Sequence, residues 1–209
     1  AQYLEGAARA AGAAGAAPLQ GALLKAAMQL NRADLPQYKA YAIWLLDQQR
    51  RDEAFTVVRN GLTMAPAQTT DFLTQMALHG VDWPDMQPAL PDLSRSWSLY
   101  AEYLDRLGRE LLAEQSHRRA VRLVASDPLP ATGPYWAFNA FLQKRERYEE
   151  ALSLLIDGLQ LFPDSADLHA RIGTQLERQG YEVRAAEFYR KALMFNPRMS
   201  WVSKRLERL

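Results

Sequence analysis

The alternation of hydrophobic and polar positions is clearest in residues 165–197, where it predicts two short helices. Apolar or small residues recur there at spacings of three and four, which is the period of a helix with one buried face. In the first helix these positions are His169, Ile172, Gly173 and Leu176. In the second they are Ala185, Tyr189, Ala192 and Leu193. Because only a short turn around Gly180 separates the helices, the pattern predicts an antiparallel hairpin that ends before Pro197.

The same pattern recurs at a fixed period along the chain. Ala151 and Ala185 are 34 residues apart, and so are Pro163 and Pro197. Numbered within one period, small residues fall at positions 8, 20 and 27 and proline at position 32. This arrangement resembles the tetratricopeptide repeat (TPR).

The resemblance implies an all-α fold, a right-handed superhelical solenoid of about five to six helical hairpins in a single domain. Residues 200–209 are expected to form a C-terminal capping helix, since a terminal repeat needs a half-polar lid. Close packing between hairpins is expected at Gly61 and Gly158, which share position 27. The predicted repeats are 1–34 (degenerate), 35–68, 69–93 (truncated), 94–131, 132–165 and 166–199.

Two segments depart from the pattern and leave alternatives open. The alanine-rich start is either a degenerate first hairpin or a flexible leader. Residues 81–93 contain prolines at 84, 88 and 91, so no regular second helix is expected there. This break is either a shortened helix that fills the stack or an insertion that offers Trp83 and Met86 to a partner. A hinge at the break would divide the chain into 1–80 and 94–209.

Composition narrows the function classes. A net charge of +1 gives no general attraction to nucleic acid, and no apolar run is long enough to insert into a membrane. The absence of cysteine excludes disulfides and thiolate metal sites but does not separate cytoplasm from periplasm. The start lacks an initiating Met and is expected to be a fragment boundary or a processed end. A periplasmic location is favoured if the chain is part of a membrane protein.

No residue pattern indicates catalysis. The histidines, His79, His117 and His169, fall in different repeats, and two of them occupy packing positions. No nucleophile, phosphate-binding or metal-binding motif is present in the sequence. We therefore expect a protein that is not an enzyme and needs no metal or cofactor.

The TPR resemblance implies that first helices line a concave groove that binds a protein or peptide partner. Arg106, Lys144 and Arg178 would form a basic row there, with Trp136 as an exposed anchor. The alternative is that these charges only solvate an open face. The full set of predicted groove residues is Lys39, Glu102, Arg106, Trp136, Gln143, Lys144, Thr174 and Arg178.

The leading hypothesis is a non-catalytic scaffold of bacterial type that binds an extended peptide or a helix in this groove. One alternative is the periplasmic tail of a membrane protein of surface-glycan assembly. Segments such as LLDQQRRDEA and SWSLYAEYLDRLGR are similar to the TPR tails of O-antigen ligase-like proteins. Another is a self-association module that forms a homo-oligomer through the 81–93 break or an end of the stack.

Overall fold

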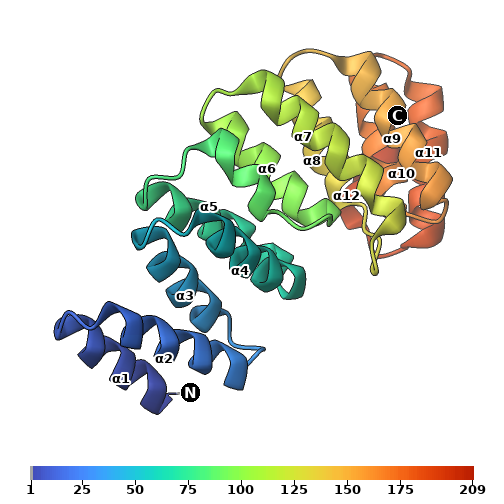
Figure 1. Cartoon of the computed structure of the whole chain (residues 1–209). Coiled ribbons are helices and arrows are strands. Elements are labelled where there is room, and N and C mark those ends of the chain that lie inside the picture. Colours follow the sequence, from blue (N-terminus) through green and yellow to red (C-terminus); the bar gives the residue numbers. More distant parts are fainter. Residues whose placement is uncertain (1) are drawn as a thin grey trace. The chain divides into compact units, whose positions relative to one another are not determined.

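The computed structural model describes residues 2–209, with side chains from residue 3 onward. This part of the chain is helical and contains no strand (Figure 1). It forms two compact units, residues 1–116 and 117–209, whose boundary falls inside one helix and not at the proline-rich break. The all-α fold predicted from the repeat pattern is confirmed.

The first unit begins with two hairpins and then becomes less regular. Helices α1 and α2 pack against each other, as do α3 and α4, and α2 also packs against α3. The residues after α5 form the 3-10 helix η2 in place of a second α-helix. The elements are α1 (Gln2–Ala13), α2 (Ala17–Leu30), α3 (Leu35–Asp47), α4 (Arg51–Met64), η1 (Pro66–Gln68), α5 (Thr69–Leu78), η2 (Trp83–Ala89), α6 (Ser94–Arg106) and the start of α7 (Glu110–Leu123).

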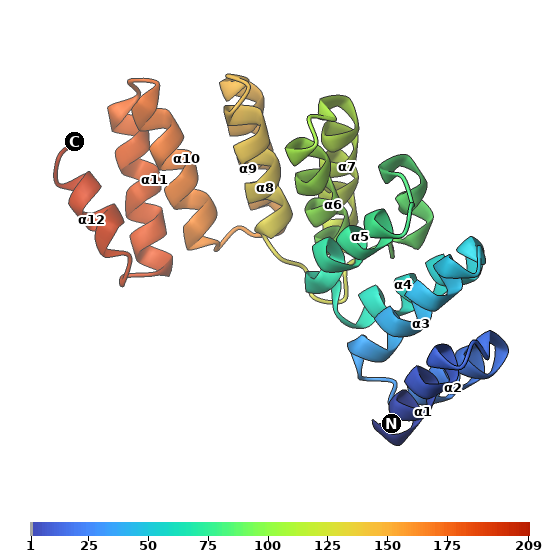
Figure 2. The same ribbon diagram turned by 90° about the vertical axis from the view of Figure 1, so that its left-hand side faces the viewer.

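The second unit contains the most regular repeats. Helices α8 and α9 form one hairpin, α10 and α11 form the next, and α12 packs on α11 (Figure 2). Helix α11 begins at Glu182, after the predicted turn around Gly180, and α12 begins at Ser200, the first residue of the predicted capping helix. After the rest of α7, the elements are η3 (Val124–Ser126), α8 (Gly133–Gln143), α9 (Tyr148–Leu161), α10 (Ala166–Arg178), α11 (Glu182–Phe195) and α12 (Ser200–Leu206).

Small residues let neighbouring helices approach closely, as the repeat pattern predicts. A Cβ added at Gly173 in α10 would lie 2.7 Å from the ring of Tyr189 in α11. One added at Gly158 in α9 would lie 3.1 Å from Tyr135 and 3.3 Å from Leu168, at the start of the next hairpin. Since real Cβ atoms essentially never approach within 3.0 Å, Gly173 has no room for a larger side chain. These contacts bring the helices together around one continuous core.

The core of the second unit passes from one hairpin to the next. Its buried side chains come from η3 and from α8 to α12, so each hairpin covers apolar surface of its neighbour. Within it Leu155, Ile172, Tyr189 and Val202 are completely buried. The predicted capping helix α12 is therefore anchored by Val202.

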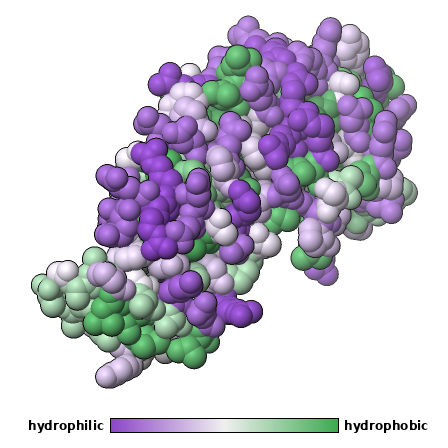
Figure 3. All heavy atoms as spheres, viewed as in Figure 1, coloured by the Kyte–Doolittle hydropathy of each residue, from purple (hydrophilic) through white to green (hydrophobic). Residues whose placement is uncertain are grey.

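The surface of the first hairpin is more hydrophobic than the rest of the face seen in Figure 3. Figure 3 shows hydrophobic side chains gathered over α1 and α2, while hydrophilic side chains dominate the rest of this face. Tyr3 and Leu30 are 86% and 72% exposed there. The hairpin of α1 and α2 thus exposes large apolar side chains.

Gly173→Val is expected to lower the free energy of unfolding by about 2–3 kcal/mol, because overpacking a well-filled helix crossing costs about that much. Urea denaturation followed by circular dichroism measures the change. Gly133→Ala is the matched control in the same unit, since a Cβ at Gly133 meets no atom within 4 Å. Equal stability of both variants would show that the α10–α11 crossing tolerates a wider spacing.

Candidate functional site

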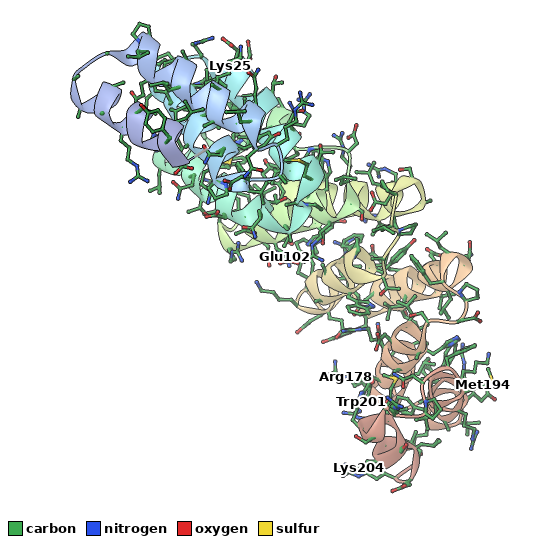
Figure 4. The ribbon with its side chains drawn as sticks, turned by 90° about the horizontal axis from the view of Figure 1, so that it is seen from below. Lys25, Glu102, Arg178, Met194, Trp201 and Lys204 are labelled. Atoms are coloured by element: carbon green, nitrogen blue, oxygen red, sulfur yellow. The ribbon has the colours of Figure 1, made fainter. Side chains whose placement is uncertain are left out.

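The second unit contains a hollow of about 390 Å³ formed by side chains of α8, α10 and α12. Figure 4 shows Arg178 of α10 and Trp201 of α12 next to each other at this place, with Lys204 and Met194 pointing elsewhere. The lining is polar and carries three arginines against one aspartate. The lining residues are Asn139, Gln143, Asp167, Arg171, Thr174, Gln175, Arg178, Trp201 and Arg205.

Helix α10 supplies most of the hollow through one of its faces. Its lining residues follow one another at spacings of four, three, one and three, which places them on one side of a helix. The opposite, buried face carries the repeat residues Leu168, Ile172 and Leu176. Packing therefore fixes which side of α10 faces the hollow. The exposed lining face is free to carry polar groups.

Hydrogen bonds connect α8 to α10 at one side of the hollow. The Arg178 guanidinium donates to Gln143 Oε1 over 3.0 Å, and Gln143 Nε2 donates to Asn139 Oδ1 over 2.7 Å. Buried Asn139 in turn donates to the carbonyl of Ala151, 2.9 Å away, and to Gln175 Oε1 at 3.3 Å. Because the chain of bonds ends in buried groups, it holds the exposed Arg178 in a defined place.

Arg171 occupies the middle of the α10 face. Its guanidinium lies over the ring of Trp136 in α8, with 4.6 Å between them. Although the residue is exposed overall, burial around its guanidinium lowers the Arg171 pKa, and the nearby charge of Asp167 partly opposes that effect. The aromatic ring thus supports a charged group whose other face is open to the hollow.

Helix α12 closes the hollow on its third side through Arg205. The Arg205 guanidinium lies 2.7 Å from Glu177 Oε2, which also accepts a hydrogen bond from the Tyr189 hydroxyl at 2.5 Å. Burial raises the pKa of Glu177, but the bonds from Tyr189 and Arg205 outweigh it, and the net pKa is lowered. The Tyr189 hydroxyl oxygen also lies 3.2 Å from Thr174 Oγ1, so the network joins α10, α11 and α12.

The structure brings together three of the five groove residues that the sequence predicted in the second unit. Gln143, Thr174 and Arg178 line the same hollow. Lys144 is exposed but does not line it. Trp136 differs from the prediction of an exposed anchor: it is partly buried against the core, and its indole Nε1 is buried without a hydrogen-bond partner. Its ring supports Arg171 instead.

The predicted groove residues of the first unit do not share a described hollow. Lys39 forms an ion pair with Asp71 and lies 5.8 Å from the Phe72 ring centroid. Glu102 is half-buried, and Arg106 is exposed at the end of α6. A role of these three residues in partner binding remains a prediction. One of them, Lys39, already has an ion-pair partner within the chain.

The proline-rich break fills the stack, as the first of the two alternatives expected. Met86 is 0% exposed, so its side chain cannot be offered to a partner, and that part of the insertion hypothesis is wrong. The physical reason is that η2 packs against α4 and α5 and takes the place of the missing helix. Trp83 is half-buried, with the Arg109 guanidinium 5.0 Å from its ring and its carbonyl accepting from Tyr100.

The histidines show the packed surroundings that two of them were predicted to have. His117 and His169 are buried, and His169 Nε2 lies 2.9 Å from the Pro163 carbonyl. His79 Nδ1 lies 2.7 Å from Asp47. Across residues 2–209, no group of three or more His, Asp or Glu residues is placed to hold a metal ion. Within the same range, no helix is both long and apolar enough to cross a membrane.

Sequence reasoning missed six of the nine lining residues, among them Arg171, Trp201 and Arg205. Trp201, which lies in the predicted capping helix, is 46% exposed and lines the hollow. A signal for Arg171 was available, because it lies seven residues before Arg178 and therefore on the same face of α10. Arg205 could not be found from periodicity, since its place depends on how α12 folds back.

Met86→Ala is expected to lower the free energy of unfolding by about 2–4 kcal/mol, because it leaves a cavity in a filled core. Trp83→Phe serves as its control in the same 3-10 helix, and it should change stability much less. Urea denaturation of both variants provides the measurement. If Met86→Ala unfolded like the wild type, η2 would not be part of the packed stack.

The lowered pKa of Glu177 predicts a pH dependence. Its ionised form stabilises the folded state fully above the ordinary pKa of 4.5, and this contribution is lost as pH falls through the lower folded-state pKa. The urea midpoint of unfolding should therefore fall less for Glu177→Gln than for the wild type when the pH is lowered from 6 to 3.5. Glu187→Gln on the exposed side of α11 should behave like the wild type, and an equal loss in all three proteins would contradict the assignment.

No family model matches the chain, and no curated protein matches it in sequence. Solved structures do match its fold. YrrB, described as a TPR protein with an unusual peptide-binding site, is 19% identical, with a TM-score of 0.51, over 89% of this chain and 98% of YrrB. The Cut9–Hcn1 hetero-tetramer of APC/C contains a chain with 13% identity and a TM-score of 0.53, over 92% of this chain and 39% of that one.

These likenesses show a TPR-like fold. Both identities are too low for anything beyond the fold to follow. The present chain spans well under half of the chain it matches in the Cut9–Hcn1 structure. None of the comparisons supports the predicted resemblance to the tails of O-antigen ligase-like proteins.

Proposed function

We propose that this protein is a non-catalytic scaffold that binds an extended peptide segment of a partner protein in the hollow of its second unit. The observation that carries the proposal is the polar lining of that hollow by α8, α10 and α12. A packed helical stack places these groups in fixed positions and leaves them accessible. Such a surface can recognise a chain without performing chemistry.

The size and lining of the hollow favour an extended segment over a bulky one. Its volume of about 390 Å³ is that of a pocket for a few side chains, and it is open on one side. Gln143 and Arg178 present donors and acceptors along its edge, and buried Asn139 holds Gln143 in place. An extended peptide exposes its own backbone N–H and C=O groups, which such side chains can bind.

The likeness to YrrB adds support of a weaker kind. That protein has the same fold and is described as having a peptide-binding site. The resemblance concerns the fold, and the hollow of this chain is its own feature. The surface-glycan and self-association alternatives stay predictions. Self-association at this end of the stack would use the exposed apolar side chains of α1 and α2.

Selection of peptides from a displayed random library against the whole chain tests the proposal. We expect selected peptides to bind at least tenfold more weakly to Arg178→Glu and to the uncharged variant Gln143→Ala, since both remove lining groups. Arg190→Glu is the matched control, because Arg190 is exposed on α11 and does not line the hollow. Fluorescence polarisation gives the affinities, and circular dichroism verifies folding.

If every selected peptide bound the two lining variants as tightly as the control, the hollow would not be the binding site. A failure of the selection to return any peptide that binds in solution would also count against the proposal. The predicted residues of the first unit, Lys39, Glu102 and Arg106, are then tested separately by the same charge reversal.

A further inference from the structure

We infer that the hollow of the second unit is selective for acidic segments, with Arg171 as the anchor and Arg205 of the capping helix as a second contact. This inference rests on the proposed function and adds the chemistry of the ligand. In this arrangement α12 both covers the core and contributes residues to the binding site. Three observations lead to it.

The first observation is an imbalance of charge and of hydrogen-bond partners. Three guanidinium groups line the hollow, and Asp167 is the one carboxylate among the lining residues. Arg178 is bonded to Gln143 and Arg205 to Glu177. Within residues 3–209, Arg171 has its contact with the Trp136 ring and the nearby charge of Asp167 but no hydrogen bond or ion pair. Its planar donors match a carboxylate in bidentate geometry.

The second observation is that Arg171 is held in place before any ligand binds. Its guanidinium lies over Trp136, and Trp136 is itself packed against the core of the second unit. A side chain that is already ordered loses less entropy on binding. The partial burial that lowers the pKa of Arg171 also strengthens its attraction for an anion. Arg171 is therefore better suited to anchor a carboxylate than a mobile surface arginine.

The third observation concerns the capping helix. Arg205 is bound to Glu177, but Glu177 also accepts a bond from Tyr189 and would keep that bond if Arg205 turned to a ligand. Trp201 is half-exposed beside it and offers an apolar surface to the ligand. The buried side chain of Val202 keeps the helix in place. An incoming carboxylate would thus compete with Glu177 for Arg205 without leaving a buried charge unpaired.

A second carboxylate of the same segment can meet Arg178, the third arginine of the lining, and helix geometry gives the spacing of such a pair. Arg171 and Arg178 are seven residues apart, which corresponds to about 10.5 Å along a helix that rises 1.5 Å per residue. In a polyproline II segment, residues three apart project from the same side and are about 9 Å apart. We therefore expect a preference for two acidic residues separated by two others.

The test uses the labelled peptide fluorescein-GDPPDPG-amide, in which prolines favour the polyproline II conformation. Its matched probe replaces both aspartates by asparagine. The acidic peptide is expected to bind the whole chain at least tenfold more tightly than its amide analogue at low ionic strength. Its affinity should fall as salt increases, because the contacts are between charges. Fluorescence polarisation measures both effects.

Variants separate a local effect from a general loss of charge. Arg171→Gln and Arg205→Gln should each weaken binding of the acidic peptide about five- to tenfold. Lys204→Gln and Arg208→Gln are matched controls, since Lys204 is exposed on α12, Arg208 is exposed just after it, and neither residue lines the hollow (Figure 4 labels Lys204). They should change the affinity less than twofold.

Glu177→Gln provides a result that simple damage to the fold would not produce. It removes the internal competitor for Arg205, and so it should tighten binding of the acidic peptide two- to fivefold. Equal binding of the aspartate and asparagine peptides, or equal weakening by the Arg208 and Arg205 variants, would overturn the inference. So would unchanged or weaker binding by Glu177→Gln.

The two proposals fail in different ways. If displayed peptides need Gln143 and Arg178 but are neutral or basic, the hollow binds peptides and the inference about acidity is wrong. If no peptide of any charge depends on Gln143 and Arg178, the proposed function itself is wrong.

Discussion

The close contact between small residues and large side chains at helix crossings is the constraint on which the structure depends. Gly173 admits the ring of Tyr189, Gly158 admits Tyr135, and Gly21 in α2 lies so close to Trp44 that an added Cβ would be 2.2 Å from the ring. These crossings let two helices share one core and bring the next hairpin into contact with it. Without them each hairpin would have to bury its apolar face alone, which a unit of this size cannot do.

This constraint also explains where polar chemistry is possible. A helix that gives one side to the core has its remaining residues on the outside, and in α10 that outside face lines the hollow of the second unit. Because packing fixes the buried side of α10, the helix cannot turn Arg171 and Arg178 away from the hollow. The same packing keeps Trp136 beneath Arg171. The polar hollow is therefore a consequence of how these helices stack.

The two irregular places show how the stack accommodates departures from the repeat. At the break, η2 supplies Met86 and Ala89 to the core in place of a helix that prolines forbid, and Arg59 donates to the exposed carbonyl of Pro88. At the C-terminus, α12 covers the last hairpin with Val202 and extends Arg205 and Trp201 toward the hollow. In both cases a short element completes the burial that the neighbouring repeat requires.

The sequence by itself determined the helical hairpins, their period of 34 residues, the closely packed glycines and the start of the capping helix at Ser200, because local spacing and helix-ending residues encode them. It also predicted that Gln143, Thr174 and Arg178 lie on the outer faces of first helices, because all three follow the helical period. Only the tertiary structure decided that Met86 is buried, that Trp136 supports Arg171, and that Arg205 reaches Glu177. Those contacts join residues 28–35 positions apart or fill gaps in the pattern, so their partners depend on how hairpins pack and not on local spacing.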